Sequence, residues 1–98
     1  MATAAVVLRE RKTDAQGNLL ELVIWKVKPT RRQPDGVRYR LALILLGQTM
    51  PVVLYDNHHP KGHHRHLDGV ETAYEFSGID RLIADFMADV TRITGANE

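Results

Sequence analysis

The sequence predicts an α+β fold: an antiparallel β-meander of four to five strands, with one C-terminal amphipathic helix packed on one face. Most of the chain consists of runs of β-branched and aromatic residues that are separated by short polar turns. Near the C-terminus the apolar residues change to the spacing of a helix. The chain has 98 residues, of which 44% are hydrophobic, so we expect a single domain over 1–98 with one modest core.

Four strands are expected at about 5–12, 19–28, 37–46 and 50–55. The segment 13–18 contains Asp, Gly and Asn, which tolerate the backbone angles of a hairpin turn. Pro29 and Pro34 bound a polar loop before the third strand, because proline has no N–H to donate to a sheet. A histidine-rich loop is expected over 56–69, and a fifth short strand over 72–76.

A helix is expected over about 78–94. Its apolar positions recur every three or four residues, as on one face of a helix: Ile79, Leu82, Ile83, Phe86, Met87, Val90 and Ile93. Ser77 and Asp80 resemble a capping box at its start, and Gly95 suits its end. The charged residues are expected on the solvated side of the helix: Asp80, Arg81, Asp85, Asp89 and Arg92.

The third expected strand is apolar on both faces in its second half, over 41–46. A strand of this kind is normally covered on both sides, and a single helix covers only one. We therefore expect a second copy of the chain, or another partner protein, on the remaining sheet face. A homodimer is the first expectation.

Composition excludes several classes of protein. The formal charge of +1 provides no overall basic field, so a contact with nucleic acid would need a local patch. Without cysteine there is no disulfide, thiolate nucleophile or thiolate metal site. No apolar run approaches membrane-spanning length, and the N-terminus lacks the basic start of a signal peptide. A cytoplasmic protein without membrane contact is expected.

All five histidines lie between positions 58 and 66. Imidazole exchanges protons near neutral pH, so the segment suits the cleavage of RNA by attack of the 2′-hydroxyl group. Such a reaction needs a base, an acid and a cation that stabilises the charged phosphorane. The candidate catalytic residues are His64 and His66 as the acid–base pair with His63 nearby, Lys61 and Arg65 on the phosphate, and Asp56 orienting an imidazole. The alternative is a solvated loop with no specific chemistry.

Metal binding is a second interpretation of this segment. In extended chain His64 and His66 point to the same side, and a third histidine could complete a site for zinc. The spacing is not a recognised ligand signature, and two nearby basic residues raise the cost of holding a cation. We expect no functional metal and no cofactor.

A second group of basic residues lies before and within the third strand, and phosphate positioning is its functional interpretation. The candidate substrate-binding residues are Arg31, Arg32, Arg38, Arg40 and Tyr55. The alternative is that these arginines are ordinary solvent-exposed residues of a loop and of the start of a strand. Trp25 and Tyr39 are candidates for stacking on bases, although a single tryptophan in a strand more often packs in a core or an interface.

The order of these motifs resembles that of a known family. Tyr55-Asp56-Asn57 is followed by Lys61-Gly62-His63-His64-Arg65-His66 and then by the closing helix, and together they resemble the TumE family of toxin components from toxin–antitoxin systems. The resemblance covers about 8–90. It implies a growth-inhibiting protein whose partner is an antitoxin with DNA-binding character.

The residue chemistry adds a specific activity to this resemblance. The histidines and their basic neighbours favour a metal-independent ribonuclease that acts on RNA. The alternative is a non-enzymatic module that binds a protein or a metal within a small regulatory complex.

Overall fold

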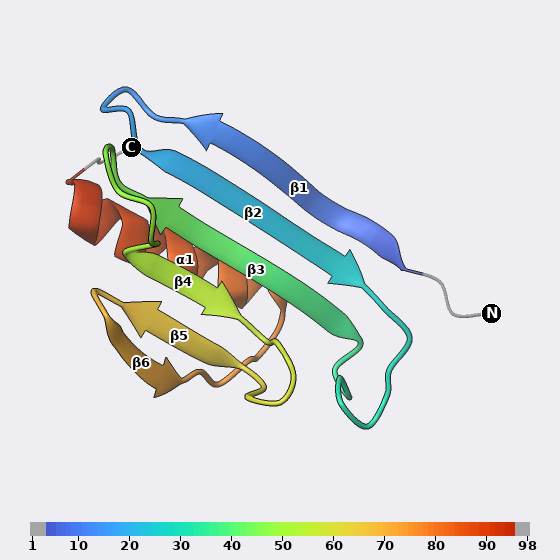
Figure 1. Ribbon diagram of the computed structural model, residues 1–98. Helices are drawn as coiled ribbons and strands as arrows, with labels where there is room; N and C mark the ends of the chain where they lie inside the picture. The colour runs from blue at the N-terminus through green and yellow to red at the C-terminus, as the bar shows by residue number, and fades with distance from the viewer. Residues whose placement is uncertain (1–3, 96–98) are drawn as a thin grey trace.

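The computed structural model describes residues 4–95 of the protein. Within these residues, six antiparallel strands form one sheet in the order of the sequence, and a single helix lies against it (Figure 1). The elements are β1 Ala5–Thr13, β2 Leu19–Lys26, β3 Val37–Ile44, β4 Val53–Asp56, β5 His64–Leu67, β6 Val70–Ala73 and α1 Ile79–Thr94. The predicted α+β meander with a C-terminal helix is confirmed, although the sheet has six strands rather than four to five.

The extra strand lies inside the segment that was predicted to be a loop. β5 pairs with β4 on one side and with β6 on the other, and β6 begins two residues before the predicted fifth strand. Asp68 and Gly69 join β5 to β6 with φ angles of 49° and 83°. Positive φ at both central residues is typical of the tight hairpin turn that matches the twist of a sheet. The sequence did not indicate this strand, because its histidines and Arg65 are polar and suggested a loop.

Strands β2 and β3 end two residues earlier than predicted, and β4 starts three residues later. The connection between β3 and β4 is held by the side chain of Asn18, whose Oδ1 accepts a hydrogen bond from the backbone N–H of Leu46 at 2.9 Å. Pro51 has no N–H to donate, which keeps the end of this connection out of the sheet.

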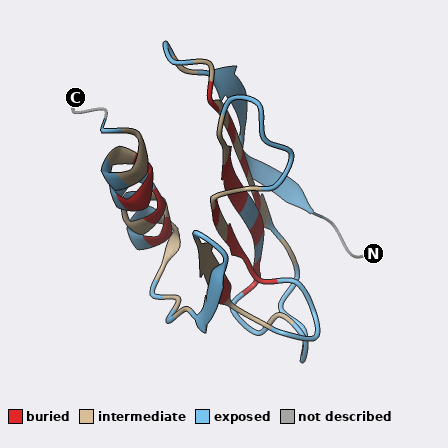
Figure 2. Cartoon of the chain, turned by 60° about the vertical axis from the view of Figure 1, so that its left-hand side comes forward, coloured by how far each residue is buried: buried red, intermediate tan, exposed pale blue. Residues whose placement is uncertain are grey.

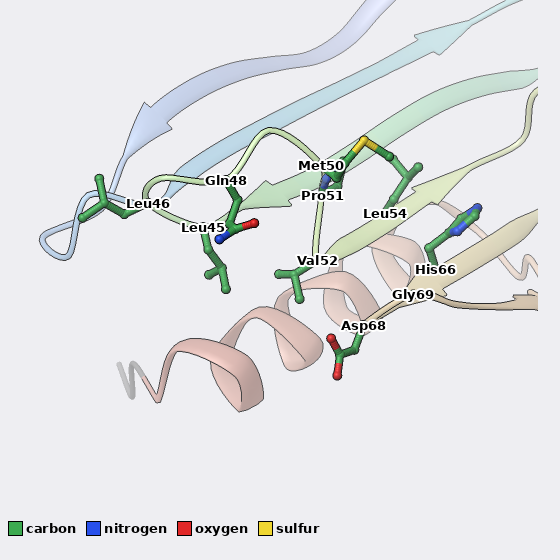
Figure 3. Close-up of a pocket in the computed structure, with 10 residues that line it drawn as sticks. All are labelled: Leu45, Leu46, Gln48, Met50, Pro51, Val52, Leu54, His66, Asp68 and Gly69. Carbon is green, nitrogen blue, oxygen red and sulfur yellow. The ribbon is translucent and has the colours of Figure 1, made fainter.

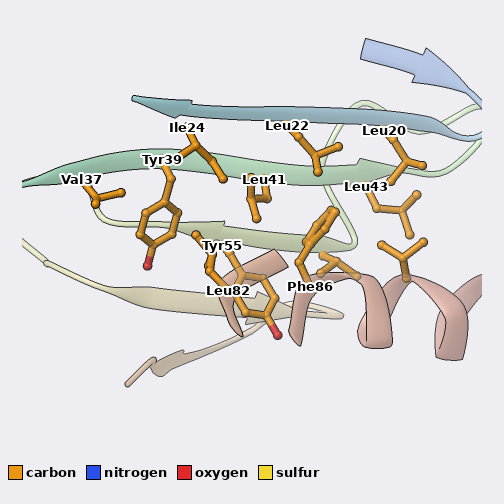
Figure 4. Close-up of a cluster of buried hydrophobic side chains, with 12 residues drawn as sticks. Leu20, Leu22, Ile24, Val37, Tyr39, Leu41, Leu43, Tyr55, Leu82 and Phe86 are labelled. Carbon is orange, nitrogen blue, oxygen red and sulfur yellow. The ribbon is translucent and has the colours of Figure 1, made fainter. Parts of the chain in front are cut away.

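The hydrophobic core lies between α1 and one face of the sheet (Figures 2 and 4). Every second residue of β2 and β3 points into it, as sheet geometry requires. Leu82 and Phe86 of α1 are fully buried, and the Phe86 ring meets the Tyr55 ring edge-on with centroids 5.8 Å apart. Within residues 4–95, no helix is long and apolar enough to cross a membrane.

The two ends of α1 differ in how well the sequence predicted them. The prediction of a capping box is wrong: the N-cap is Gly78, and among the described residues no side chain caps the start of the helix. Gly95 ends the helix as predicted, with φ of 73° and its N–H donating to the Thr91 carbonyl at 2.8 Å. Glycine suits this left-handed position because it has no side chain to clash.

One side of α1 also differs from the prediction. Asp89, which was expected in solvent, is buried, whereas Met87 of the apolar stripe is 36% exposed. The helix is rotated so that Asp89 faces the sheet, where Tyr55 and Arg65 donate hydrogen bonds to its carboxylate. A charge can be buried at this position because it is paired and fully hydrogen-bonded.

Candidate functional site

One face of the sheet is not covered by α1, and we call it the open face (Figure 2). Alternation along the strands places Arg38 and Arg40 of β3 on this face, and His64 and His66 of β5. Asp56 of β4 lies between Arg40 and His64 in the register of the sheet. The sheet thus brings the histidine pair and two of the predicted arginines to the same side.

His64 is held firmly on the open face. Its side chain is 8% exposed, and both ring nitrogens face oxygen atoms: Nδ1 lies 2.9 Å from the Gly62 carbonyl, and Nε2 lies 2.8 Å from Asp56 Oδ1. A carbonyl and a carboxylate can only accept hydrogen bonds, so both nitrogens donate when both bonds are made. The predicted pairing of Asp56 with an imidazole is present here.

His66 is more accessible, with a side chain that is 30% exposed. Its Nε2 lies 3.4 Å from Oε1 of Glu71, which is its direct partner on β6, and the His64 and His66 rings are 5.2 Å apart. Lys61 Nζ lies 2.9 Å from the same Glu71 oxygen. This hydrogen bond lowers the pKa of Glu71 below its ordinary value, so the carboxylate is ionised. We call these five residues the histidine cluster: Asp56, Lys61, His64, His66 and Glu71.

His63 has hydrogen-bond partners of its own. Its Nδ1 lies 2.9 Å from the Tyr39 hydroxyl and its Nε2 lies 2.8 Å from Asp35 Oδ2, while its ring stacks on Phe76 at 4.9 Å. Burial raises the pKa of Tyr39, so its hydroxyl keeps its proton. The Asp35 carboxylate can only accept a hydrogen bond, so Nε2 of His63 donates to it. His63 lines a shallow hollow together with Lys61, His64 and Glu71, but the groups that its ring bonds to, Tyr39 and Asp35, lie outside the histidine cluster.

Arg65 and Tyr55 face the core rather than the open face. Arg65 binds the Asp89 carboxylate through Nε at 2.9 Å and Nη2 at 3.0 Å, and Tyr55 donates to the same carboxylate at 2.6 Å. Tyr55 is 2% exposed. Arg65 was predicted to bind phosphate and Tyr55 to bind substrate, and here both side chains join the sheet to α1.

The predicted arginines are spread over a loop and the open face. Arg31 and Arg32 are exposed in the loop between β2 and β3, away from the strands themselves. Arg38 and Arg40 are exposed within β3. Arg40 also lies 3.5 Å from Glu21, so part of its charge is balanced.

A hollow of about 670 Å³ opens beside His66 at one end of the sheet (Figure 3). Leu54, the direct neighbour of His66 on β4, lines it together with Met50 and Val52. Met50 is 75% exposed. The hollow is therefore an apolar surface next to a titratable side chain, which is the usual character of a ligand site.

Sequence reasoning missed several members of these groups. Glu71 gave no signal on its own, because its place opposite His66 follows from the β5–β6 register. Asp35 reaches His63 from a distant loop. Arg9 of β1 lies over the Trp25 ring at 5.0 Å on the open face, and only the alternation of the two strands could have indicated it.

The histidine cluster has the groups for two kinds of chemistry. An accessible imidazole, a second imidazole bonded to a carboxylate, and an ammonium group lie together, as acid–base attack on a phosphodiester requires. His64, His66 and Glu71 also each offer one ligand atom, and these atoms lie within 4.8 Å of one another, so they could hold a metal ion.

Comparison with known proteins gives one finding. A sequence model of the family described as Toxin TumE matches residues 3–94 of the chain. No curated protein and no solved structure gives a significant match.

Proposed function

Since the chain belongs to the TumE toxin family, we propose that it is the toxin of a toxin–antitoxin pair and that it cleaves RNA without a metal cofactor. One observation carries the second part: His64 and His66 lie side by side, with Lys61 close to them, on a sheet face that bears arginines. RNA and a protein partner of this kind both imply action in the cytoplasm.

His66 is the base in this proposal. It is the more exposed of the two rings, and a base must reach the 2′-hydroxyl proton that it removes. Glu71, which lies 3.4 Å from Nε2, can stabilise the imidazolium that forms. Attack of the resulting oxygen on the adjacent phosphorus gives a phosphorane with additional negative charge.

His64 is the acid. It holds a proton on Nε2 that it shares with Asp56, and it passes this proton to the departing 5′ oxygen when that oxygen takes the place of the carboxylate. Asp56 then acts as the orienting group. Lys61, whose side chain is 57% exposed, turns from Glu71 to the phosphate and stabilises the charge of the phosphorane.

Arg65 has a positioning role in this account, because its guanidinium is already bound to Asp89 on the other side of the sheet. It fixes β5 against α1 and thereby fixes the two neighbouring histidines. Tyr55 supports the same contact, and His63 holds the loop before β5 through Asp35 and Tyr39.

RNA would lie along the open face. Arg38 and Arg40 offer positive charge on β3, and Trp25 with Arg9 beside it offers an aromatic surface for a base. The apolar hollow beside His66 suits a base next to the cleaved phosphate (Figure 3). Arg31 and Arg32 add charge at the β2–β3 loop.

The partner in this proposal is an antitoxin with DNA-binding character that covers the open face. The partly exposed Leu54 lies in the middle of this face, between charged side chains, so a protein segment could pack there. An antitoxin bound to this face would exclude RNA, which would explain how it neutralises the toxin. The competing arrangement is a homodimer that packs through the same face. Sedimentation of the free chain distinguishes a monomer with an open face from such a dimer, in which the face that we assign to RNA would be covered.

A non-enzymatic binding module is the second candidate. It is favoured by His64, whose ring nitrogens are both occupied by groups of the protein itself. In that case the histidine cluster would stabilise the β4–β5–β6 hairpins and the toxin would act by binding a protein.

Growth after induced expression tests the proposal. Wild type, His66→Asn and His59→Asn are expressed at matched levels, the last as a control because His59 is exposed in the loop before β5. We expect arrest by the wild type and the control, and growth with His66→Asn. Arrest by a folded His66→Asn variant would support the binding module instead.

A modified substrate separates the acid from the base. In an RNA whose bridging 5′ oxygen is replaced by sulfur, the leaving group departs without a proton, so the acid becomes unnecessary. We expect this RNA to restore cleavage by His64→Asn but not by His66→Asn. The opposite pattern would exchange the two roles, and no rescue of either variant would contradict the acid assignment to His64.

A further inference from the structure

We infer that His64, His66 and Glu71 form a binding site for a zinc-like divalent metal, and that the bound metal inhibits the toxin. The inhibition rests on the ribonuclease function proposed above, whereas the metal site does not. Two imidazoles and one carboxylate are a ligand set that zinc accepts, with a fourth position left for water.

The separations of the ligand atoms suit such an ion. Bond lengths of about 2.0–2.2 Å in a tetrahedral site place neighbouring ligand atoms roughly 3.3 Å apart. His66 Nε2 and Glu71 Oε1 are already 3.4 Å apart, and one ligand atom from each of the three residues lies within 4.8 Å of the others. Rotation of side chains is therefore enough to complete the site, since both strands are fixed by the β5–β6 register.

His64 is oriented for this role by its second nitrogen. Ligand histidines usually donate their other ring N–H to a carbonyl or a carboxylate, which fixes the tautomer and the ring. Nδ1 of His64 donates to the Gly62 carbonyl at 2.9 Å, so Nε2 is the nitrogen that faces the cluster. A metal bound at Nε2 would take the place of the proton there, and that proton would go to solvent. Asp56 Oδ1 lies 2.8 Å from Nε2, too close for an ion between the two atoms, so its carboxylate would turn aside.

Lys61 opposes the metal. Its ammonium group binds Glu71 Oε1 at 2.9 Å, so it competes for the carboxylate ligand and repels a cation. The side chain is exposed and can move away, but its charge weakens the site. Lys61→Met should therefore bind the metal more tightly than the wild type does, while it loses activity on RNA. These opposite effects would not arise if Lys61 only stabilised the fold.

Inhibition follows from the identity of the ligands. A metal on His66 Nε2 takes the lone pair that the proposed base needs, and a metal on His64 removes the proton of the proposed acid. The toxin would then be silent while the metal is bound and active after it is removed.

Calorimetric titration with zinc chloride alone tests the site, using the full chain after treatment with EDTA. We expect one equivalent of zinc bound by the wild type, and binding that is at least about tenfold weaker in His66→Asn and Glu71→Gln. Loss of a residue that only supports a metal ligand already weakens binding by about tenfold or more, so loss of a ligand itself should cost at least as much. Lys61→Met should bind more tightly, and His59→Asn should equal the wild type. Weak binding that His59→Asn reduces and Glu71→Gln does not would mean adventitious capture by the loop and would overturn the site.

RNA cleavage by the same samples then tests the inhibition. We expect activity in EDTA, loss of activity with one equivalent of zinc, and recovery on chelation. Activity that requires zinc would overturn the inhibition and the metal-independent mechanism but leave the site. Zinc binding with no cleavage under any condition would refute the ribonuclease function alone.

Discussion

The guanidinium of Arg65 and the carboxylate of Asp89 form a two-point contact between β5 and α1, with Nε–Oδ2 at 2.9 Å and Nη2–Oδ1 at 3.0 Å. The Asp89 side chain is 3% exposed and also accepts hydrogen bonds from Tyr55 and Arg92. This contact ties the strand that carries both cluster histidines to the helix on the other side of the sheet.

Arg65→Ala should destabilise the fold by about 3 kcal/mol, because it leaves a buried carboxylate with fewer partners. Arg81→Ala is the matched control: Arg81 pairs with Asp85 on the exposed side of α1, and its loss should cost about 0.5 kcal/mol or less. Urea unfolding followed by circular dichroism measures both. Equal effects of the two changes would mean that the buried pair does not hold the helix.

Because of the Asp89 carboxylate, we expect the stability of the fold to decrease in acid. Burial by itself raises the pKa of Asp89, but the hydrogen bonds from Arg65 and Tyr55 outweigh it and hold the pKa below its ordinary value of 3.8. A lowered pKa contributes stability above the unfolded value, and this contribution is lost as the pH falls through the folded value.

Asp89→Asn should therefore be less stable than the wild type near neutral pH, and the difference should shrink at about pH 2.5. Unfolding free energies at both pH values measure it. A difference that stays constant over this range would show that the ionised form of Asp89 is not the stabilising one.

The tyrosines predict how the stability of the fold changes at high pH. Burial raises the pKa of Tyr39, Tyr55 and Tyr74 above the ordinary value of 10.0, and hydrogen bonds to Asp89 and Asp85 add to this for the last two. These are all the tyrosines of the chain. A raised pKa contributes stability that is lost as the pH rises above the unfolded value.

The folded protein should thus show almost no tyrosinate absorbance at about pH 10.5, and ionisation should coincide with unfolding. Absorbance and circular dichroism recorded in one alkaline titration test this. A tyrosine that ionises at its ordinary pKa while the fold is intact would contradict the buried hydroxyl groups.

The sequence was sufficient for the parts of the fold that depend on local patterns. The turn at 13–18, the helix stripe and the stop at Gly95 follow from turn chemistry and helical spacing. β5 was missed because its residues alternate between a polar open face and a core face where the partly buried Arg65 binds Asp89. The Asp68–Gly69 turn was the local signal that could have indicated this hairpin.

The site was less predictable than the fold, because its contacts are long-range. His64 and His66 on one side follow from strand geometry, as predicted. The pairing of His66 with Glu71 depends on a register, and that of His63 with Asp35 depends on two loops meeting. The burial of Asp89 requires a partner on the sheet that no helical pattern reveals.

Trp25 provides a direct test of RNA binding on the open face. It is the only tryptophan of the chain, it is half-buried, and Arg9 lies over its ring. Its fluorescence should change when single-stranded RNA is added, and Arg40→Gln should weaken this binding more than the control Arg81→Gln on α1. RNA binding without any change at Trp25, or with equal loss in both variants, would place the RNA elsewhere.

Cleavage of single-stranded RNA by the purified chain in EDTA tests the central claim most directly, with His66→Asn and His59→Asn measured beside the wild type. We predict cleavage by the wild type and by His59→Asn, and a loss of about 10²–10⁴-fold in His66→Asn with its fold intact. Folded wild-type protein that leaves RNA intact, or a His66→Asn variant that cleaves as fast as the wild type, would contradict the account.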